Sequence, residues 1–561
     1  MTGAAGSSDV VNPRKKSFLD TVERIGNRLP DPVLIFVWLI VAVIALSAVG
    51  AAAGWVAVNP VTQATLNATS LLSSANLERL FVEMPRTLTA FAPLGYVLLV
   101  MLGAGIAERT GLFGAAMRSI VRMAPARLLT PIVLFAGVMG NQAVDAAFVI
   151  LPPLAAALYV AAGRHPLLGI AVAFAGVAGG FSANLLPGGL DALLLGLTEP
   201  AARLLDPDWR MNIAGNWYFI IAMTVVFVPL GWWVAEKIIA PRLGPWTGPR
   251  QPSTLAAGAA ATSTATGPAT EVSPPGMAPG AAGPSISTVD EQRGLRAAMI
   301  AGAVVVGLFA VLAWPALWAG VTGGAPLYDE SVGPNGRLEQ GLQPLFQAMV
   351  AGFFLLFLAT GIAYGRATGV NKSHRDEIRM ISEGMTDMAY YIVLAFVAAH
   401  FVALFNWSNL GGILAIKGAA TLLATGLPTP VLLVGIVLLA ATINLAIGSA
   451  SAKWAMLAPV LVPMLMLLNV SPEMTTAAFR MGDSVTNPIT PLMVYFPLVL
   501  TFCQRWDPRF GMGGLIATML PFSLAFLLAG LAMTFGWAAL ELPLGPGAEV
   551  SYTIPPPVAA P

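Results

Sequence analysis

Breaks inside long apolar segments constrain the fold of this chain more than any other feature. Residues 444–491 are apolar up to Gly448-Ser449-Ala450-Ser451, resume through Trp454, and break again between Ser484 and Pro491. Each break places hydroxyls, amides or charges where a plain membrane span has only hydrocarbon side chains. Such backbone is tolerated at membrane depth only where protein buries it or where it lines a cavity. The stretch therefore predicts a solute site inside a membrane.

Composition agrees with a membrane protein and excludes several other classes. The chain is 57% hydrophobic and 10% charged, whereas soluble proteins carry about 25% charged residues. A net charge of +1 gives no reason to expect a nucleic-acid partner. Cys503 is the only cysteine, which excludes an intrachain disulfide and a cysteine metal cluster. Metalloprotease, serine-hydrolase and Walker motifs are absent from the sequence, so we expect a secondary transporter and not an enzyme or an ATP-driven pump.

The predicted fold class is an all-α polytopic membrane protein with about nine transmembrane helices, two re-entrant hairpins and broken helices. A span needs roughly 20 mainly apolar residues. The segments that meet this are 33–58, 92–108, 167–205, 213–238, 297–319, 344–364, 388–405, 475–501 and 511–537. The third is too long for one helix and is expected to break near 182–187. Two further apolar segments, 129–160 and 429–469, carry polar residues or a break in the middle and are predicted to enter and leave on one side.

Basic residues in short loops predict the orientation, because cytoplasmic loops carry an excess of Lys and Arg. Arg14, Lys15 and Lys16 place the N-terminus in the cytoplasm. Further basic clusters at 109–127, 237–250, 366–379 and 505–509 fall on the same side only if neither hairpin crosses the membrane. The C-terminus is then outside.

The predicted organisation has two halves joined by a linker. Residues 1–30 form a cytoplasmic N-terminal segment, and 31–245 form the first half. Residues 246–292 are rich in Pro, Ala, Gly, Ser and Thr and predict a disordered cytoplasmic linker. Residues 293–540 form the second half, and 541–561 a Pro-rich tail.

The two halves show a weak internal repeat. NQAVDAAFVILPPL (141–154) and GSASAKWAMLAPVL (448–461) both place a polar tip about eleven residues before a proline. FSANLLPGGLD (181–191) and DSVTNPITPL (483–492) both carry a hydroxyl, an Asn and a Pro at a break. With the orientation above, the hairpins open from opposite sides, which is an inverted repeat. In secondary transporters of this kind, the site lies between the repeats at discontinuous helices.

Carboxylates and amides at the breaks are the first candidate site residues. A charge at the bilayer centre costs at least about 2.5–3.5 kcal/mol, so it is expected to be paired, hydrated or functional. Asp145 and Asp191 are therefore interpreted either as cation ligands or proton carriers, or as caps of half-helix N-termini. Four asparagines lie at or near the breaks and either coordinate sodium or satisfy freed backbone groups: Asn141, Asn184, Asn444 and Asn487.

The second hairpin tip offers groups for an anionic, aromatic solute. Ser449 and Ser451 provide hydroxyls beside the amides of a half-helix N-terminus. Trp454 presents a flat face for an aromatic ring, or else belongs to an interfacial belt. Lys453 contacts the solute or neutralises a carboxylate.

The last broken helix carries Arg480 and Asp483, which are three residues apart and are predicted to pair along one helical face. The Arg480 guanidinium matches a carboxylate or sulfonyl group through two donors, and Asp483 would take a proton or cation. The alternative is a surface pair at the outer mouth. Pro472 and Pro491 shape the turn and the break.

Several long motifs resemble the p-aminobenzoyl-glutamate transporter (AbgT) family. They are ERTGLF (108–113), GNQAVDAAFVILPPL (140–154), GFSANLLPGGLDALL (180–194), GSASAKWAMLAPVLVPM (448–464) and AFRMGDSVTNPITPLMVYFPL (478–498). The resemblance covers essentially 15–540. It implies a homodimer with nine spans and two hairpins per subunit. It also implies aromatic-acid substrates, namely p-aminobenzoyl-glutamate, p-aminobenzoate and sulfonamide antimetabolites.

Carried over by position, the resemblance implies functional roles for Asp191, Ser451, Trp454, Pro472, Arg480, Asp483 and Pro491. It also points to sodium at the first hairpin tip. The full prediction assigns Ser449, Asn184 and Asn487 to the solute site as well. Asn141, Asp145 and Asn444 form a candidate sodium site. No cofactor is expected other than Na+ as a coupling ion.

The predicted function is ion-coupled export of such aromatic acids across a bacterial inner membrane by a multi-pass protein, with a solute, the lipid bilayer and a second copy as partners. A sodium-coupled importer of p-aminobenzoyl-glutamate or of a dicarboxylate is the alternative. An intramembrane aspartyl enzyme built on Asp145 and Asp191 is a third reading, and a channel is a fourth.

Overall fold

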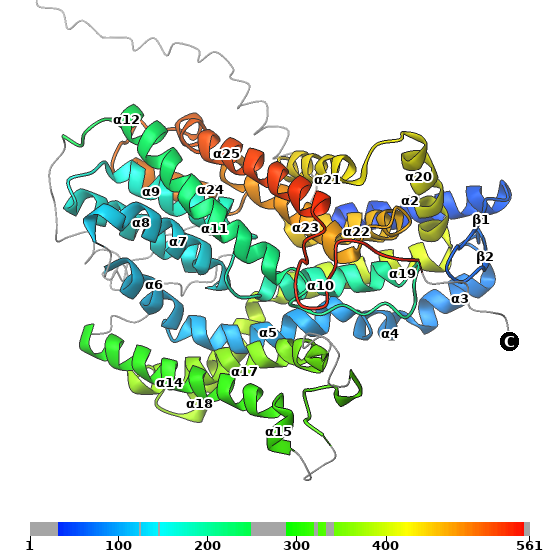
Figure 1. The fold of residues 1–561 in the computed structure, drawn as a ribbon, viewed down its shortest axis with the longest axis horizontal. Helices are drawn as coiled ribbons and strands as arrows, with labels where there is room; N and C mark the ends of the chain where they lie inside the picture. The colour runs from blue at the N-terminus through cyan, green and yellow to red at the C-terminus, as the bar shows by residue number, and fades with distance from the viewer. Residues whose placement is uncertain are drawn as a thin grey trace, which may run out of the picture.

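The computed structural model describes residues 32–122, 125–143, 146–247, 288–318, 324–332 and 341–554. The predicted N-terminal segment, most of the predicted linker and Asp145 lie outside these ranges. The described chain is mostly helical, with one pair of short strands (Figure 1).

Long apolar helices account for most of the predicted spans. Six of the described helices are long and apolar enough to cross a membrane. They are α2 (Pro32–Ala52), α11 (Trp217–Val234), α14 (Thr288–Leu312), α17 (Gln343–Ala367), α19 (Ala389–Trp407) and α25 (Met512–Ala539). The α11 helix continues through a π-helical turn, Ala235–Ile239, into α12 (Ala240–Leu243). A seventh candidate is the pair α5 (Ala92–Arg109) and α6 (Leu112–Arg122), which is bent by 61°.

The other two predicted spans are broken helices, as the sequence indicated. The first consists of α9 (Pro166–Phe174), a π-helical turn at Ala175–Gly179, a non-helical break, and α10 (Gly189–Ala202). The second consists of α23 (Pro472–Val485), a 3-10 turn at Asn487–Ile489, and α24 (Phe496–Gln504). Each broken helix follows a helical hairpin, and this order is the same in both halves. The hairpins are α7 (Leu129–Gly140) with α8 (Ala146–Ala161), and α21 (Thr429–Asn444) with α22 (Ala450–Met466).

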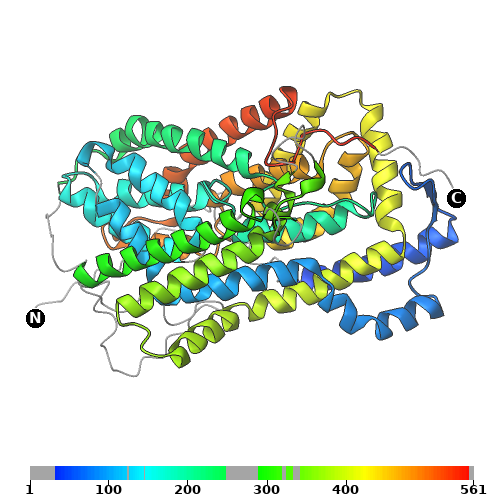
Figure 2. The same cartoon turned by 60° about the horizontal axis from the view of Figure 1, so that its bottom comes forward.

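The hairpins and broken helices surround the main hydrophobic core. Helix α21 packs on α23, α23 on α25, α25 on α11, and α11 on α7. The large buried side chains of this core include Phe174, Phe227, Phe522 and Phe526. A second layer consists of α5, α14, α17 and α18 (His374–Asp387), which lie side by side in Figure 2. Helix α17 contacts α14 and α5, and α5 contacts α18 and packs on α10.

Several elements differ from the sequence prediction. Helix α2 ends at Ala52, so the last part of the predicted span 33–58 is instead the strand β1 (Val56–Val58), which pairs with β2 (Thr65–Asn67). Helix α14 starts at Thr288, inside the predicted linker. Helices outside every predicted span and hairpin include α3 (Ser74–Val82), α4 (Met84–Thr89), α6, α18 and α20 (Leu410–Ala424). Helix α15 (Pro315–Trp318) is a separate short helix at the end of the predicted span 297–319.

Close glycine contacts hold the first hairpin helix against the broken helix in each half. A Cβ on Gly137 of α7 would lie 2.9 Å from the Cα of Gly176. A Cβ on Gly482 of α23 would lie 2.1 Å from the carbonyl oxygen of Val437 in α21. The two halves therefore repeat both the order of elements and the way they pack.

We expect Gly482→Ala to destabilise the protein by about 1–3 kcal/mol, because the added methyl group has to push α21 away from α23. Thermal unfolding of purified protein, followed by tryptophan fluorescence, measures this as a lower Tm. Gly435→Ala on α21 is the matched control, because a Cβ there would meet nothing within 4 Å. Equal Tm values for the two variants would contradict the prediction.

Candidate functional site

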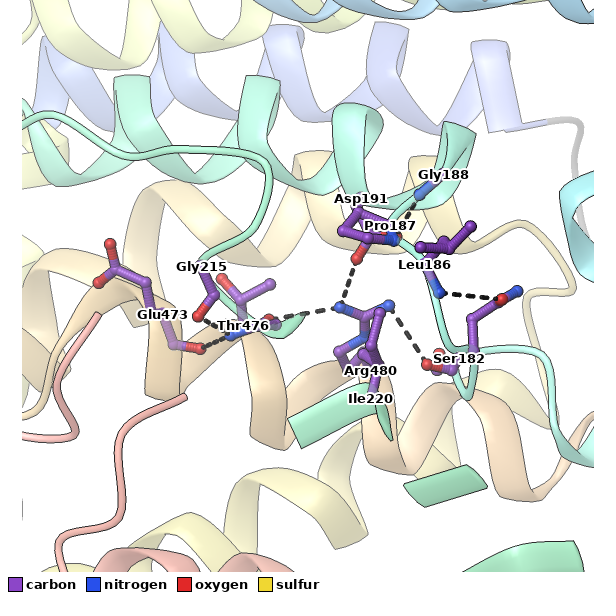
Figure 3. A network of polar contacts seen from close by, with 12 residues as sticks. Ser182, Leu186, Pro187, Gly188, Asp191, Gly215, Ile220, Glu473, Thr476 and Arg480 are labelled. Carbon is purple, nitrogen blue, oxygen red and sulfur yellow. Dashed lines mark hydrogen bonds and ion pairs between the residues drawn. The ribbon is translucent and has the colours of Figure 1, made fainter. Parts of the chain in front are cut away.

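A buried ion pair joins the two halves of the chain. Arg480 in α23 donates from Nη1 to the Asp191 carboxylate at 2.7 Å. The two side chains are 289 positions apart in sequence and are only 2% and 8% exposed. Figure 3 shows Arg480 reaching across from its helix toward the start of α10. The pair therefore lies between the repeats, where the inverted-repeat argument placed the site.

The local fold explains the position of Asp191. It is the third residue of α10, and its second carboxylate oxygen accepts a hydrogen bond from the Gly188 amide at 2.8 Å. Such a contact satisfies a backbone donor left free at a helix start. The structure shows the cap reading of Asp191, while its other oxygen pairs with Arg480. The reading as a cation ligand or proton carrier stays a prediction.

The remaining donors of Arg480 are only partly used. Nη2 donates to the Ser182 carbonyl at 3.3 Å, as seen in Figure 3, and Nη1 also approaches the Asn216 amide oxygen at 3.5 Å. The buried Nε has no hydrogen-bond partner among the described residues. Because a guanidinium can hold a carboxylate through two parallel donors, Arg480 retains capacity for an anionic group.

The predicted pairing of Arg480 with Asp483 is wrong. Asp483 forms an ion pair with Lys453 from α22, and both side chains are fully buried. The reason is that α23 lies between the break of the first half and the second hairpin. Arg480 faces the first half and pairs with Asp191, whereas Asp483 faces the second hairpin and pairs with Lys453. The reading in which Lys453 neutralises a carboxylate is the one that the structure shows.

Asparagine amides extend this second cluster. Lys453 also donates to the side-chain oxygen of Asn444, the last residue of α21. The Asn444 amide nitrogen donates to the Asp483 carbonyl at 2.7 Å, to Thr486 at 2.9 Å and to the Asn487 side chain at 2.8 Å. Both atoms of the Asn444 amide are thus engaged within the second half.

The first hairpin tip carries a similar amide, that of Asn141, in which only the nitrogen has partners among the described residues. The Asn141 nitrogen donates to the carbonyls of Val138 and Gly180, each at 3.1 Å. Its oxygen, and the hydroxyl of Ser182, have no partner among the described residues. Asn184 is buried, accepts from the Leu185 amide at 2.9 Å, and so satisfies backbone at the break. The hydrogen bonds of Asn141 and Asn444 among the described residues all go to groups of their own half.

Trp454 is fully buried, so it is not a belt tryptophan. Its ring stacks on Phe479 of α23, with centroids 4.3 Å apart. Its Nε1 donates to the Thr198 hydroxyl of α10 at 2.8 Å, and Thr198 in turn contacts Thr476 at 3.0 Å. Phe479 thus covers one face of the indole, and Trp454 connects α22 to both broken helices.

The other predicted residues shape the tips and turns. Ser449 caps α22 by accepting from the Ala452 amide, and its hydroxyl lies 3.0 Å from that of Ser451. Pro472 is the first residue of α23. Pro491 lies in the non-helical segment between the 3-10 turn and α24.

Two adjoining cavities lead to the ion pair. A cavity of about 260 Å³ is lined by residues from α5, α10, α17 and the loop before α11, including Tyr96, Glu199 and Arg210. A second cavity of about 20 Å³ is lined by Asp191 and Arg480. Both share Met211 and Asn212 among their linings. The inner cavity is too small for an aromatic acid, so binding beside Arg480 requires the surrounding helices to move.

Comparison with known proteins identifies the family to which this arrangement belongs. The sequence pattern of the AbgT putative transporter family matches residues 17–266 and 281–552. The chain belongs to this family. An AbgT relative, the p-aminobenzoyl-glutamate transport protein of Escherichia coli (strain K12), is 34% identical over 534 residues, covering 94% of this chain and 95% of the relative.

Two solved structures show the same fold as this AbgT chain. The YdaH transporter of Alcanivorax borkumensis, described as having an unusual topology, gives a TM-score of 0.80 at 40% identity, covering 92% of this chain and all of the other. MtrF of Neisseria gonorrhoeae, described as illuminating a class of antimetabolite efflux pumps, gives 0.82 at 39% identity, covering 95% and 100%. The resemblance noted in the sequence is confirmed, and the relatives are transporters and not enzymes.

The AbgT site contains groups that the sequence analysis did not single out. Thr198, Thr486, Asn216 and Phe479 are ordinary side chains in apolar or helical surroundings, and no local pattern distinguishes them. Glu473 is different, since a carboxylate at the second position of α23 is fully buried and one of its oxygens has no partner among the described residues. Its place in an otherwise apolar stretch was a usable signal.

Proposed function

We propose that this protein is an ion-coupled exporter of p-aminobenzoyl-glutamate, p-aminobenzoate and related aromatic acids, including sulfonamide antimetabolites. The E. coli relative is a p-aminobenzoyl-glutamate transport protein, and the N. gonorrhoeae neighbour belongs to a class of antimetabolite efflux pumps. The observation that carries the proposal is the Asp191–Arg480 ion pair between the two halves.

The ion pair provides a physical basis for coupling. A solute carboxylate that binds Arg480 has to displace Asp191, and a buried carboxylate without a partner is strongly unfavourable. Asp191 is therefore stable away from Arg480 only with a proton or sodium ion. Solute and ion then act on the same pair of residues, which is the minimum requirement for coupled transport.

The aromatic part of the solute is assigned to the second half. An aminobenzoyl ring would take the place of Phe479 on the Trp454 indole when α22 and α23 separate. Stacked aromatic pairs contribute about 0.5–1.5 kcal/mol beyond burial. An aliphatic dicarboxylate gains nothing from this face, so the site favours an aromatic acid.

We place the protein in a bacterial inner membrane with its N-terminus in the cytoplasm. The basic loops supply the argument, and they are linked to one another by ion pairs such as Arg109–Glu383 and Arg118–Glu291. In this orientation the 260 Å³ cavity opens toward the outside. A homodimer is part of the proposal, on the family resemblance alone, and light scattering of the detergent-solubilised protein tests it.

A sodium-coupled importer is the second candidate. What favours it is the first hairpin tip, where the Asn141 oxygen and the Ser182 hydroxyl are buried without partners among the described residues. Neutral oxygen atoms of this kind are suitable ligands for a hard cation such as sodium. Simultaneous binding of cation and solute gives cotransport, whereas alternate binding gives exchange.

Uptake of labelled p-aminobenzoate into proteoliposomes under imposed sodium or proton gradients tests the proposal. If the protein exchanges solute for cation, labelled p-aminobenzoate accumulates when the cation is more concentrated inside the vesicles. If it cotransports them, p-aminobenzoate accumulates when the cation is more concentrated outside. Excess p-aminobenzoyl-glutamate is expected to compete, and excess succinate is not.

We expect Trp454→Ala and Asp483→Ala each to lower the initial rate at least about tenfold, which corresponds to 1.4 kcal/mol. The first loses the aromatic face, and the second leaves Lys453 buried without its carboxylate. Lys417→Ala, an exposed lysine on α20, is the matched control. Flux that ignores both gradients, or normal transport by both variants, would exclude this mechanism.

A further inference from the structure

We propose that the ammonium group of Lys453 is a tethered cation that occupies, in the second half, the position used by a free coupling ion in the first half. The two halves of the site would then differ in one respect. One binds a mobile cation, and the other carries its cation on a side chain. The inference deepens the ion coupling proposed above and rests on it.

The surroundings of Lys453 resemble a cation site. Its side chain is 1% exposed and contacts the Asn444 amide oxygen and the Asp483 carboxylate. Amide and carboxylate oxygens are the ligands that hard cations prefer. The Asn444 oxygen is directed at the ammonium because its nitrogen is held by Asp483, Thr486 and Asn487.

The first half repeats the amide without the lysine. In each half an asparagine at the end of the first hairpin helix donates to a backbone carbonyl of the broken helix, Asn141 to Gly180 and Asn444 to Asp483. In the second half the amide oxygen accepts from Lys453. In the first half the amide oxygen is buried and has no partner in the part of the chain that the structure describes, and the same holds for the hydroxyl of Ser182, which is 2% exposed.

The sequences of the two hairpins agree with this difference. The first hairpin, 129–161, contains no lysine or arginine, whereas the second carries Lys453. No described lysine or arginine of this hairpin reaches the Asn141 oxygen, which leaves that oxygen available to a free cation. The second half needs none while Lys453 is in place.

Removal of the lysine should therefore create a requirement for a free cation. We expect Lys453→Ala to be destabilised in choline chloride and to regain stability with sodium or methylammonium at matched ionic strength. A ligand that binds only the folded state raises the Tm in a saturable way. The wild-type protein should respond to sodium through the first half, and its Tm should rise less with methylammonium than that of Lys453→Ala, because Lys453 fills the second site.

The experiment measures Tm against NaCl, methylammonium chloride and choline chloride for the purified full-length chain. The variants are Lys453→Ala, the neutral double variant Lys453→Ala with Asp483→Asn, and the control Lys417→Ala. The double variant has lost the carboxylate that would attract the new cation, so it should bind methylammonium much more weakly. The midpoint for methylammonium in Lys453→Ala should be at least about tenfold lower than in the double variant.

Each outcome decides the inference. A methylammonium response at least about tenfold stronger in Lys453→Ala than in the double variant, and larger than in wild type, supports it. So does a Lys453→Ala protein that folds only when methylammonium or sodium is present. A folded Lys453→Ala protein that behaves like wild type overturns it. So does a variant that no cation restores while the double variant folds. Because the readout contains no solute, failure to transport p-aminobenzoyl-glutamate would count against the proposed function alone.

Discussion

Replacing Arg480 with methionine should reduce transport of p-aminobenzoyl-glutamate by at least about a hundredfold. The substitution removes the cation that the solute carboxylate would bind and leaves Asp191 buried without a partner. Hydrogen bonds to charged groups contribute about 1.5–3 kcal/mol each, and a guanidinium can make two of them to one carboxylate. Losing both exceeds the 2.7 kcal/mol that corresponds to a hundredfold change in rate. The initial rate of uptake into proteoliposomes, normalised to incorporated protein, measures the effect.

A second variant separates loss of function from loss of fold. Arg480→Met combined with Asp191→Asn removes both charges, so its Tm should recover toward wild type while transport stays at background. Arg366→Met is the matched control, since Arg366 is mostly exposed in its pair with Glu377, and exposed pairs contribute about 0–1 kcal/mol. Transport by Arg480→Met within threefold of wild type would refute the assignment of Arg480 to the solute.

Local sequence was sufficient to locate the breaks and the charged residues of the site. Gly, Ser, Asn and Pro interrupt apolar helices for reasons that act within a few residues. A charge inside an apolar stretch is conspicuous because it is costly there. These signals identified Asp191, Arg480 and Asp483, and the structure places all three in buried ion pairs.

The partners of these charges could not be predicted in the same way. Helical periodicity relates Arg480 to Asp483, three residues on, but has no information about Asp191, which lies in the other half. The environment of Trp454 was missed for the same reason, because Phe479 and Thr198 reach it from two different helices. Helix α20 was not predicted because its apolar stretch of 15 residues is shorter than a span and follows another apolar helix closely.

The C-terminal segment illustrates a further limit of composition. Its Pro and Gly content predicted a tail, but residues 541–554 are bound to the rest of the chain. The Leu544 carbonyl accepts from the Tyr218 amide at 2.8 Å, and Pro546 accepts from the Asn212 side chain at 3.1 Å. The Ser471 amide donates to the Val550 carbonyl at 2.9 Å. Pro and Gly reduce helix formation, but they do not prevent an extended segment from pairing with other loops.

Tyr552 makes two further contacts between the C-terminal segment and the rest of the chain. Its hydroxyl donates to the Asp206 carboxylate at 3.0 Å, and its amide donates to the Asn469 carbonyl at 2.9 Å. Burial raises the pKa of Tyr552 above its ordinary value of 10, and the hydrogen bond to Asp206 raises it further. The phenol therefore stays protonated and continues to donate at physiological pH.

We expect a chain that ends at Leu540 to unfold at a Tm lower by at least about 10 °C, because several hydrogen bonds of about 1 kcal/mol each and the burial of Leu544 and Tyr552 are lost together. A chain that ends at Ile554 keeps every contact named above and is the matched control. Thermal unfolding measured on both proteins in the same detergent gives the comparison. Equal Tm values would mean that the segment is not a structural part of the fold.

The same truncation should also reduce transport, because the segment connects the walls of the site. It holds the loop that carries Asn212 and Asn216 against the start of α23, and Arg480 lies two turns further along that helix. Tyr552→Phe removes a single hydrogen bond, so it should lower the Tm by only a few degrees and leave the uptake rate within about twofold of wild type. Truncation that lowers the Tm but leaves uptake at a permissive temperature unchanged would show that the segment stabilises the fold without positioning Arg480.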